Sequence, residues 1–202
     1  MIPKGPKPQW GTRLVFAALV SLSLLLTLRA SLPADSLLNF DGGRAYEHVW
    51  RLVEIGPRPP ASEGIHRAQA YIIGQLKSYS CPVEEHDFHA PTPLGDLAMK
   101  NIVVKIAGTG QGIVLYTTHY DTVRIPNFVG ADDGGSGAGT TLELARLFCA
   151  RKNLLNVWIV FFVGEEAQGN WTGKASVQWN NDGSNNTFGS REMALKWRFP
   201  AN

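Results

Sequence analysis

Two segments in the first half of the chain repeat apolar residues at the spacing of an amphipathic helix. The first, GRAYEHVWRLVEIG at 43–56, stops at the break GPRPP. The second, SEGIHRAQAYIIGQLKSYS at 62–80, begins with Ser62 in the position of an N-cap. Both are predicted to be helices, and the core stripe of the second would comprise Ile65, Ala68, Tyr71, Ile72 and Leu76.

Runs typical of β-strands follow. PVEEHDFHA at 82–90 alternates as a half-exposed strand does, and KNIVVKIAG at 100–108 is more apolar. GIVLYTTHY at 112–120 is apolar enough to be buried on both faces. The intervening GTGQG at 108–112 leads into a strand and not into a helix, so we interpret it as a hairpin-like turn and not as a dinucleotide-binding loop.

After these strands come a turn, a helix pattern and another strand. The turn FVGADDGGSG at 128–137 is followed by a helical pattern at 136–152 and by the apolar strand NVWIVFFVGEE at 156–166. The order strand, helix, strand is the crossover unit of a parallel sheet. The sequence therefore predicts an α/β fold of three layers, with a mostly parallel central sheet and helices on both faces.

The N-terminal 34 residues have a different character. LVFAALVSLSLLLTL at 14–28 carries no charge and follows a basic flank, so residues 1–34 are expected to contain a hydrophobic helix and a linker. Two interpretations stay open, a membrane anchor with Arg13 and Arg29 at the two surfaces, or a cleaved signal peptide. Either places the single globular domain at 35–202 outside the cytoplasm, on the periplasmic or extracellular side of the membrane, or secreted.

Composition removes some classes of function. The formal net charge is +2, but residues 1–29 contribute four basic side chains and no acid, which leaves the rest of the chain slightly acidic. No nucleic-acid partner is expected. Cys81 and Cys149 are far apart, and no disulfide framework is expected. The sequons at Asn170 and Asn185 fit exposed loops.

Acidic residues and a histidine gather where the predicted strands end or a helix begins. Each has an ordinary structural interpretation: Asp132 or Asp133 could cap the helix that follows, His119 could be a hydrogen-bonded histidine at a strand end, and Glu165 and Glu166 could be a solvated strand end. The carboxyl ends of neighbouring strands face one crevice, however, and imidazole with carboxylates is a ligand set for zinc. The residues that this interpretation brings together are His119, Asp121, Asp133, Glu165 and Glu166.

The spaced set HYDT, GADDGGSG and FFVGEEA resembles the zinc-dependent aminopeptidases whose relatives include the glutaminyl-peptide cyclotransferases. The resemblance runs from about residue 57 to the end of the chain. RIPNFVGADD, LELARLF and FGSREMALKW are more similar to the cyclotransferase branch. This resemblance implies one or two bound zinc ions and substrates that are peptide or protein N-termini.

The resemblance also implies a role for each matching residue. Asp133 would be shared between two metal positions, Glu166 would bind the metal retained in cyclases, and His119 would bind the other. Glu165 would be the general acid-base residue, and Asp121 would orient His119. The polar, glycine- and asparagine-rich segment at 168–186 has two interpretations that rest on composition and not on the resemblance: a loop that shapes the substrate entrance through Trp171 or Trp179, or a disordered surface insertion.

Three functions remain open on the sequence. A cyclotransferase would convert an N-terminal glutamine to pyroglutamate and release ammonia, and an aminopeptidase would hydrolyse the first peptide bond with the same residues. The third is a membrane-tethered, non-catalytic domain that binds peptides. Relatives supply a further aspartate and a distal histidine, which do not occur before Asn202, so we expect a domain incomplete at its C-terminus with impaired activity.

Overall fold

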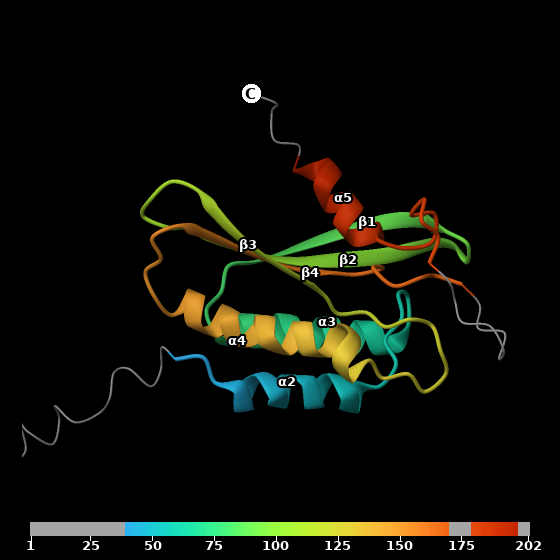
Figure 1. Ribbon diagram of the computed structural model, residues 1–202, viewed down its shortest axis with the longest axis horizontal. Coiled ribbons are helices and arrows are strands. Elements are labelled where there is room, and N and C mark those ends of the chain that lie inside the picture. The colour runs from blue at the N-terminus through green and yellow to red at the C-terminus, as the bar shows by residue number, and fades with distance from the viewer. Residues whose placement is uncertain (1–38, 170–178, 198–202) are drawn as a thin grey trace, which may run out of the picture. The chain divides into compact units, whose positions relative to one another are not determined.

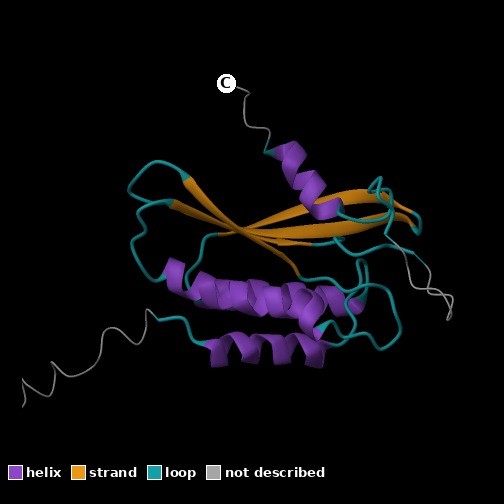
Figure 2. Ribbon diagram, viewed as in Figure 1, coloured by secondary structure: helices purple, strands orange, loops and turns teal. Residues whose placement is uncertain are grey.

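A four-stranded sheet lies between helices in this computed structural model, which describes residues 39–169 and 179–197. The strands are β1 (Val83–Thr92), β2 (Gly95–Ile106), β3 (Ile113–His119) and β4 (Asn156–Phe162), in the order β1-β2-β4-β3. The helices are α2 (Gly42–Ile55), α3 (Glu63–Ser78), α4 (Gly137–Cys149) and α5 (Phe188–Lys196), and a π-helical turn η1 (Ala131–Ser136) precedes α4. Figures 1 and 2 show α3 and α4 against one face of the sheet, α5 on the other, and α2 outside α4.

The sheet is mixed. β3 and β4 are parallel and joined through α4, as the crossover pattern predicted, but β1 with β2 and β2 with β4 are antiparallel. The expectation of a mostly parallel sheet is therefore wrong for these four strands. The segment GTGQG is not a hairpin turn either, because β4 lies between β2 and β3. Instead it crosses the start of β4, where Gly110 N donates to the Leu154 carbonyl at 2.7 Å.

β3 forms one edge of this sheet. Among the described residues its partner is β4, and Ile113 and Leu115 remain 42% and 50% exposed. The expectation that this strand is buried on both faces is wrong for the described part of the chain. Apolar composition identifies a strand, but it does not tell what covers each face.

The helices begin where their side chains can satisfy backbone N–H groups. Asp41 accepts from the N–H groups of Gly43 and Arg44 at the start of α2. Ser62 Oγ accepts from Ile65 N at 3.1 Å at the start of α3, so its predicted capping role is confirmed. The predicted stripe of α3 is buried except for Tyr71, which is partly exposed and bonds to His48 Nδ1 at 2.6 Å.

The core has two clusters. The larger one joins α3 and α4 to the sheet and includes Leu52 of α2 and Phe188 of α5. The smaller one joins Val103 and Val160 to Met193 of α5. Burying one such side chain stabilises the fold by about 1.5–3 kcal/mol. The expectation of helices on both faces is confirmed.

Cys81 and Cys149 form a disulfide, with sulfur atoms 2.07 Å apart and a sequence separation of 68. The expectation of no disulfide is wrong. Packing of α3 beside α4 brings the loop before β1 to the last residue of α4, a proximity that sequence spacing does not reveal. The sequon asparagine Asn185 is also not exposed, since it is 6% accessible and its Oδ1 accepts from Asn180 N at 2.9 Å.

Two features of the sequence lie outside the described residues. The hydrophobic segment 14–28 belongs to residues 1–38, and the sequon at Asn170 belongs to residues 170–178. Within residues 39–169 and 179–197, no helix is both long and apolar enough to cross a membrane.

Candidate active site

The two parallel strands end side by side. His119 is the last residue of β3 and pairs in register with Phe162, the last residue of β4. Tyr120 N continues the pairing with a hydrogen bond to the Phe162 carbonyl at 3.1 Å. The loops that leave these strands, with Asp121 on one and Glu165 and Glu166 on the other, therefore start at the same edge of the sheet.

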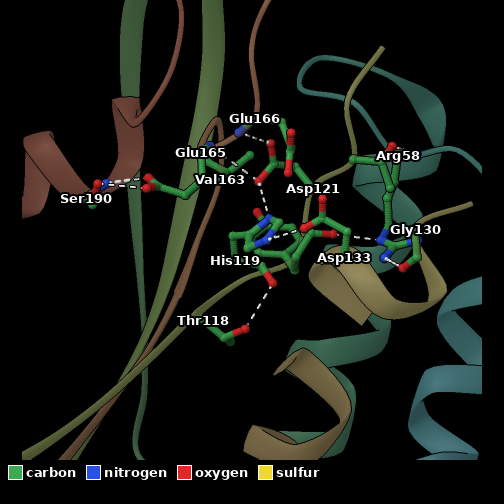
Figure 3. A network of polar contacts seen from close by, with 12 residues as sticks. Arg58, Thr118, His119, Asp121, Gly130, Asp133, Val163, Glu165, Glu166 and Ser190 are labelled. Carbon is green, nitrogen blue, oxygen red and sulfur yellow. Dashed lines mark hydrogen bonds and ion pairs between the residues drawn. The ribbon is translucent and has the colours of Figure 1, made fainter. Parts of the chain in front are cut away.

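Asp121 connects the two loops. Its carboxylate is fully buried and accepts the backbone N–H of Glu165 at 3.4 Å and that of Glu166 at 3.3 Å. Its Oδ1 also lies 3.6 Å from His119 Nδ1. The Asp121 side chain thus fixes the GEE turn and the imidazole relative to one another (Figure 3).

Asp133 reaches the same place from η1. Its backbone leaves the helical region (φ −75°, ψ 112°), and its Oδ1 lies 3.2 Å from His119 Nε2. The next residue, Gly134, has φ of 80°, and a Cβ there would lie 2.7 Å from the Asp121 carbonyl oxygen. Only glycine fits this position, so the glycine run is what presents Asp133.

Neither aspartate of this turn caps a helix. The residue before η1 is Gly130, the residue before α4 is Ser136, and neither position makes a side-chain capping hydrogen bond. The alternative interpretation of Asp132 or Asp133 as an N-cap is therefore wrong. Asp133 turns toward His119 instead, with its side chain 57% exposed.

His119, Asp133 and Glu166 form the described group best suited to a metal ion. Each offers one ligand atom, and these atoms all lie within 4.8 Å of one another. Burial, with the charges of Asp133 and Asp121, raises the pKa of Glu166 to about 7. Burial alone would lower the pKa of His119, but Asp121, Glu166 and Asp133 outweigh it and raise that pKa to about 9. Because several carboxylates lie close together beside an imidazole, binding of a cation is favourable here.

The donor set fits zinc. Catalytic zinc sites use three protein ligands of the imidazole and carboxylate types and leave a position open. His119 Nδ1 is buried and makes no hydrogen bond in the described structure, so the imidazole is held by ion-pair contacts with carboxylates on both ring nitrogens.

The Glu165 carboxylate points elsewhere. Its Oε1 accepts Ser190 N at 2.7 Å and its Oε2 accepts Ser190 Oγ at 2.8 Å, at the start of α5 (Figure 3). Burial raises the pKa of Glu165, against the hydrogen bonds from Ser190, which lower it. The two adjacent glutamates therefore have different surroundings.

One open pocket of about 540 Å³ is bordered by His119, Asp133, Glu165, Glu166 and Ser190. Its other walls include Thr117, Phe162 and Trp179, whose indole is 53% exposed. Trp171, the sequence candidate for substrate contact, lies outside the described residues. The other five candidates lie together: His119, Asp133, Glu165 and Glu166 line the pocket, and the fully buried Asp121 contacts His119 and the GEE turn.

Sequence reasoning missed Arg58. This arginine of the GPRPP break is fully buried and donates to the carbonyls of Tyr120, Val129 and Gly130, which belong to the connection between β3 and η1. Burial lowers its pKa to about 10, against the attraction of Asp121 and Asp133, so it stays charged at neutral pH. An arginine between two prolines in the sequence was the available signal, and the prolines were interpreted only as a helix stop.

Comparison with known proteins gives the same family as the motifs. Residues 101–198 match the model of peptidase family M28. The glutaminyl-peptide cyclotransferase of Drosophila melanogaster is 28% identical over 149 residues, which cover 70% of this chain and 39% of the relative. That of Bos taurus is 27% identical over 190 residues, which cover 83% of this chain and 49% of the relative. The chain thus spans less than half the length of these two relatives.

Solved structures with a similar fold include enzymes of the same two kinds, a glutaminyl cyclase and an exopeptidase. A glutaminyl cyclase from an Acidobacteriales bacterium has a TM-score of 0.69 and 31% identity, over 83% of this chain and 56% of that one. A Zn-dependent exopeptidase from Parabacteroides distasonis has a TM-score of 0.67 and 25% identity, over 81% of this chain and 59% of that one. The chain is therefore similar to glutaminyl-peptide cyclotransferases and a Zn-dependent exopeptidase, and its residues 101–198 match peptidase family M28, as its motifs predicted.

Proposed function

We propose that this chain is a zinc-dependent enzyme of peptide N-termini with glutaminyl-peptide cyclotransferase activity. The observation that carries the proposal is the convergence of ligand atoms from His119, Asp133 and Glu166 within 4.8 Å, beside the Glu165 carboxylate in one pocket. The names of the relatives supply the reaction class.

Each residue has a stated part in this reaction. His119, Asp133 and Glu166 would hold zinc, either as one ion bound by all three or as two ions that share Asp133, and Asp121 would keep the imidazole and the GEE turn in place. When bound, zinc supplies a Lewis acid that polarises the side-chain carbonyl of an N-terminal glutamine. Glu165 accepts a proton from the attacking α-amine and gives it to the departing ammonia, so that it ends unchanged.

The open pocket suits such a substrate. Its acidic side, formed by Asp133, Glu165 and Glu166, attracts a positively charged peptide N-terminus, which loses one proton to solvent before the neutral amine attacks. Phe162 and Trp179 provide apolar surface for the rest of the peptide. An aminopeptidase would use the same residues with water as the attacking group, and the similarity to a Zn-dependent exopeptidase keeps that reaction as the second candidate.

One incubation separates these reactions. The purified chain with zinc is given a peptide that begins with glutamine, and the products are measured by mass spectrometry. A cyclotransferase leaves a full-length peptide lighter by one ammonia, whereas an aminopeptidase releases free glutamine. Bound zinc and bound peptide without either product would instead indicate a non-catalytic peptide-binding domain.

Three variants assign the residues. We expect Glu166→Gln to lose both zinc and turnover, and Glu165→Gln to keep zinc but lose turnover by about 100-fold or more. Asp132→Asn is the matched control, because Asp132 is exposed and outside the ligand group. Equal activity in Glu165→Gln and the unchanged chain would contradict the proposed role of Glu165.

We also propose that the domain acts outside the cytoplasm, tethered through residues 14–28 or secreted. The disulfide between Cys81 and Cys149 supports this, since such bonds persist in oxidising compartments. Protease digestion of intact cells, followed by detection of the membrane-bound domain, tests the tether. Protection of the domain until the cells are lysed would contradict an external location.

A further inference from the structure

The start of α5 is attached to the turn that carries the two glutamates. Thr187 N donates to the Glu165 carbonyl at 3.2 Å, and Phe188 N donates to the Gly164 carbonyl at 2.9 Å. Asn101 strengthens this attachment, because its amide accepts from Val163 N at 3.2 Å and donates to the Gly189 carbonyl at 2.9 Å. The position of Ser190 relative to the turn is therefore fixed by the backbone.

Close packing shows that this attachment is built into the fold. A Cβ on Gly189 would lie 2.5 Å from both the Asn101 side-chain oxygen and the Val163 carbonyl oxygen. A glycine is thus required one residue before Ser190, so that the helix can approach β2 and the end of β4. Ser190 itself borders the pocket together with His119, Asp133 and Glu166.

Ser190 uses both of its donors on one carboxylate. Its backbone N–H and its hydroxyl bind the two oxygens of Glu165 at 2.7 and 2.8 Å, while Glu166 offers a carboxylate oxygen to the ligand group. Each carboxylate oxygen has a second lone pair, so Glu165 can still accept a proton while it is held. The Thr187 carbonyl, 3.4 Å from Ser190 Oγ, gives the hydroxyl another acceptor when Glu165 is protonated.

We propose that Ser190 is the positioning residue for Glu165: it holds that carboxylate at the pocket wall for proton transfer and keeps it out of the metal-ligand group. The inference rests on the proposed function for the proton-transfer role. A purely structural alternative exists, since Thr187 makes no side-chain cap and Glu165 could serve only as the cap of α5.

The first measurement needs neither metal nor substrate. In NMR spectra of the metal-free, full 202-residue chain, the Ser190 amide proton should resonate downfield, as expected for a donor to a carboxylate, and move upfield in Glu165→Gln. An amide resonance unaffected by Glu165→Gln would overturn the proposal, whatever the chain catalyses.

The second measurement tests whether Ser190 keeps Glu165 out of the ligand group. Co²⁺ in excess replaces zinc as a spectroscopic probe, and its visible absorption reports the number of ligands. We expect Ser190→Ala to change the spectrum because the freed Glu165 joins the ligands, and Ser190→Ala with Glu165→Gln to restore it. Ser190→Thr, which keeps the hydroxyl, and Ser78→Ala, an exposed serine of α3, should match the unchanged chain. Identical spectra for Ser190→Ala and the unchanged chain would contradict the proposal.

Turnover separates positioning from helix capping. We expect Ser190→Ala to lower kcat about 10- to 100-fold with KM within about twofold, and Ser190→Thr to recover most of kcat. A lower melting temperature with unchanged kcat would leave only the cap and overturn the proposal. A chain without turnover contradicts the proposed function, and the cobalt spectra then decide the inference. If Co²⁺ does not bind either, the proposed metal site fails and the amide resonance decides whether Ser190 holds Glu165.

Discussion

Asp133 Oδ1 lies 3.2 Å from Nε2 of His119. Asp133 belongs to η1, which follows Gly130 in the left-handed region, whereas His119 is the last residue of β3. The contact closes the connection between β3 and α4 onto itself. It also leaves the opposite nitrogen of the ring beside Asp121, so the imidazole lies between two carboxylates (Figure 3). Negative charge is thereby concentrated where a cation would bind, at a cost to the metal-free protein.

Replacing Glu166, a proposed metal ligand, should therefore stabilise the metal-free chain. The pKa of Glu166 rises from 4.5 to about 7 on folding. The folded chain then keeps a proton that the unfolded chain releases, so this group makes stability fall as pH rises from about 4.5 to about 7. Above that range we expect Glu166→Gln to increase the free energy of unfolding by on the order of 1 kcal/mol, because partial exposure weakens the effect.

Zinc should reverse the order of stability, so that the unchanged chain becomes more stable than Glu166→Gln. Thermal unfolding with and without a chelator checks this: zinc is expected to raise the Tm of the unchanged chain and not that of Glu166→Gln. Asp132→Asn serves as the control for a neighbouring charge and should keep the zinc response. A zinc-dependent rise of equal size in Glu166→Gln would show that Glu166 is not a ligand.

The backbone at Gly134 should tolerate no side chain. Its φ is 80°, and an added Cβ would lie 2.7 Å from the Asp121 carbonyl oxygen. Gly134→Ala is therefore expected to lower stability by about 1–3 kcal/mol and to weaken zinc binding. Gly74→Ala is the matched control, because Gly74 lies within α3 with open space where a Cβ would be added. That change should instead stabilise the chain by about 0.5–1 kcal/mol. Equal effects of the two substitutions in urea unfolding would refute the argument.

Arg58 should contribute more to the free energy of unfolding than Arg67, an exposed arginine nearby in the sequence. Arg58→Met removes the donor from the carbonyls of Tyr120 and Val129 and one of two donors from that of Gly130, and we expect a loss of about 3–5 kcal/mol. Arg67→Met removes an exposed hydrogen bond to the Ile55 carbonyl and should cost less than about 1 kcal/mol. Urea titrations of both variants provide the comparison, and similar midpoints would argue against a central role for Arg58.

The disulfide should stabilise the fold because it closes a long loop of the chain. A bond that closes 68 residues is expected to stabilise the fold by about 4 kcal/mol, so reduction or Cys81→Ser with Cys149→Ser should lower the Tm markedly. The double variant should not respond further to a reducing agent, which separates loss of the bond from other effects of reduction. An unchanged Tm after complete reduction, verified by thiol titration, would contradict this expectation.

The sequence by itself determined the local elements and identified the residues of the candidate site. Helix periodicity and the Ser62 cap placed α3, alternating and apolar runs identified the strands, and the spaced motifs singled out His119, Asp133 and Glu166. These features depend on neighbours a few residues apart along the chain, or on motifs shared with a family, so they are readable without coordinates.

Only the tertiary structure decided which distant segments meet. The insertion of β4 between β2 and β3, the disulfide of Cys81 with Cys149 and the burial of Arg58 all join residues far apart in sequence. The same is true of Ser190, which reaches Glu165 only because α5 packs across the end of β4. Strand order and side-chain partners depend on how whole layers pack together, and local sequence pattern does not specify that packing.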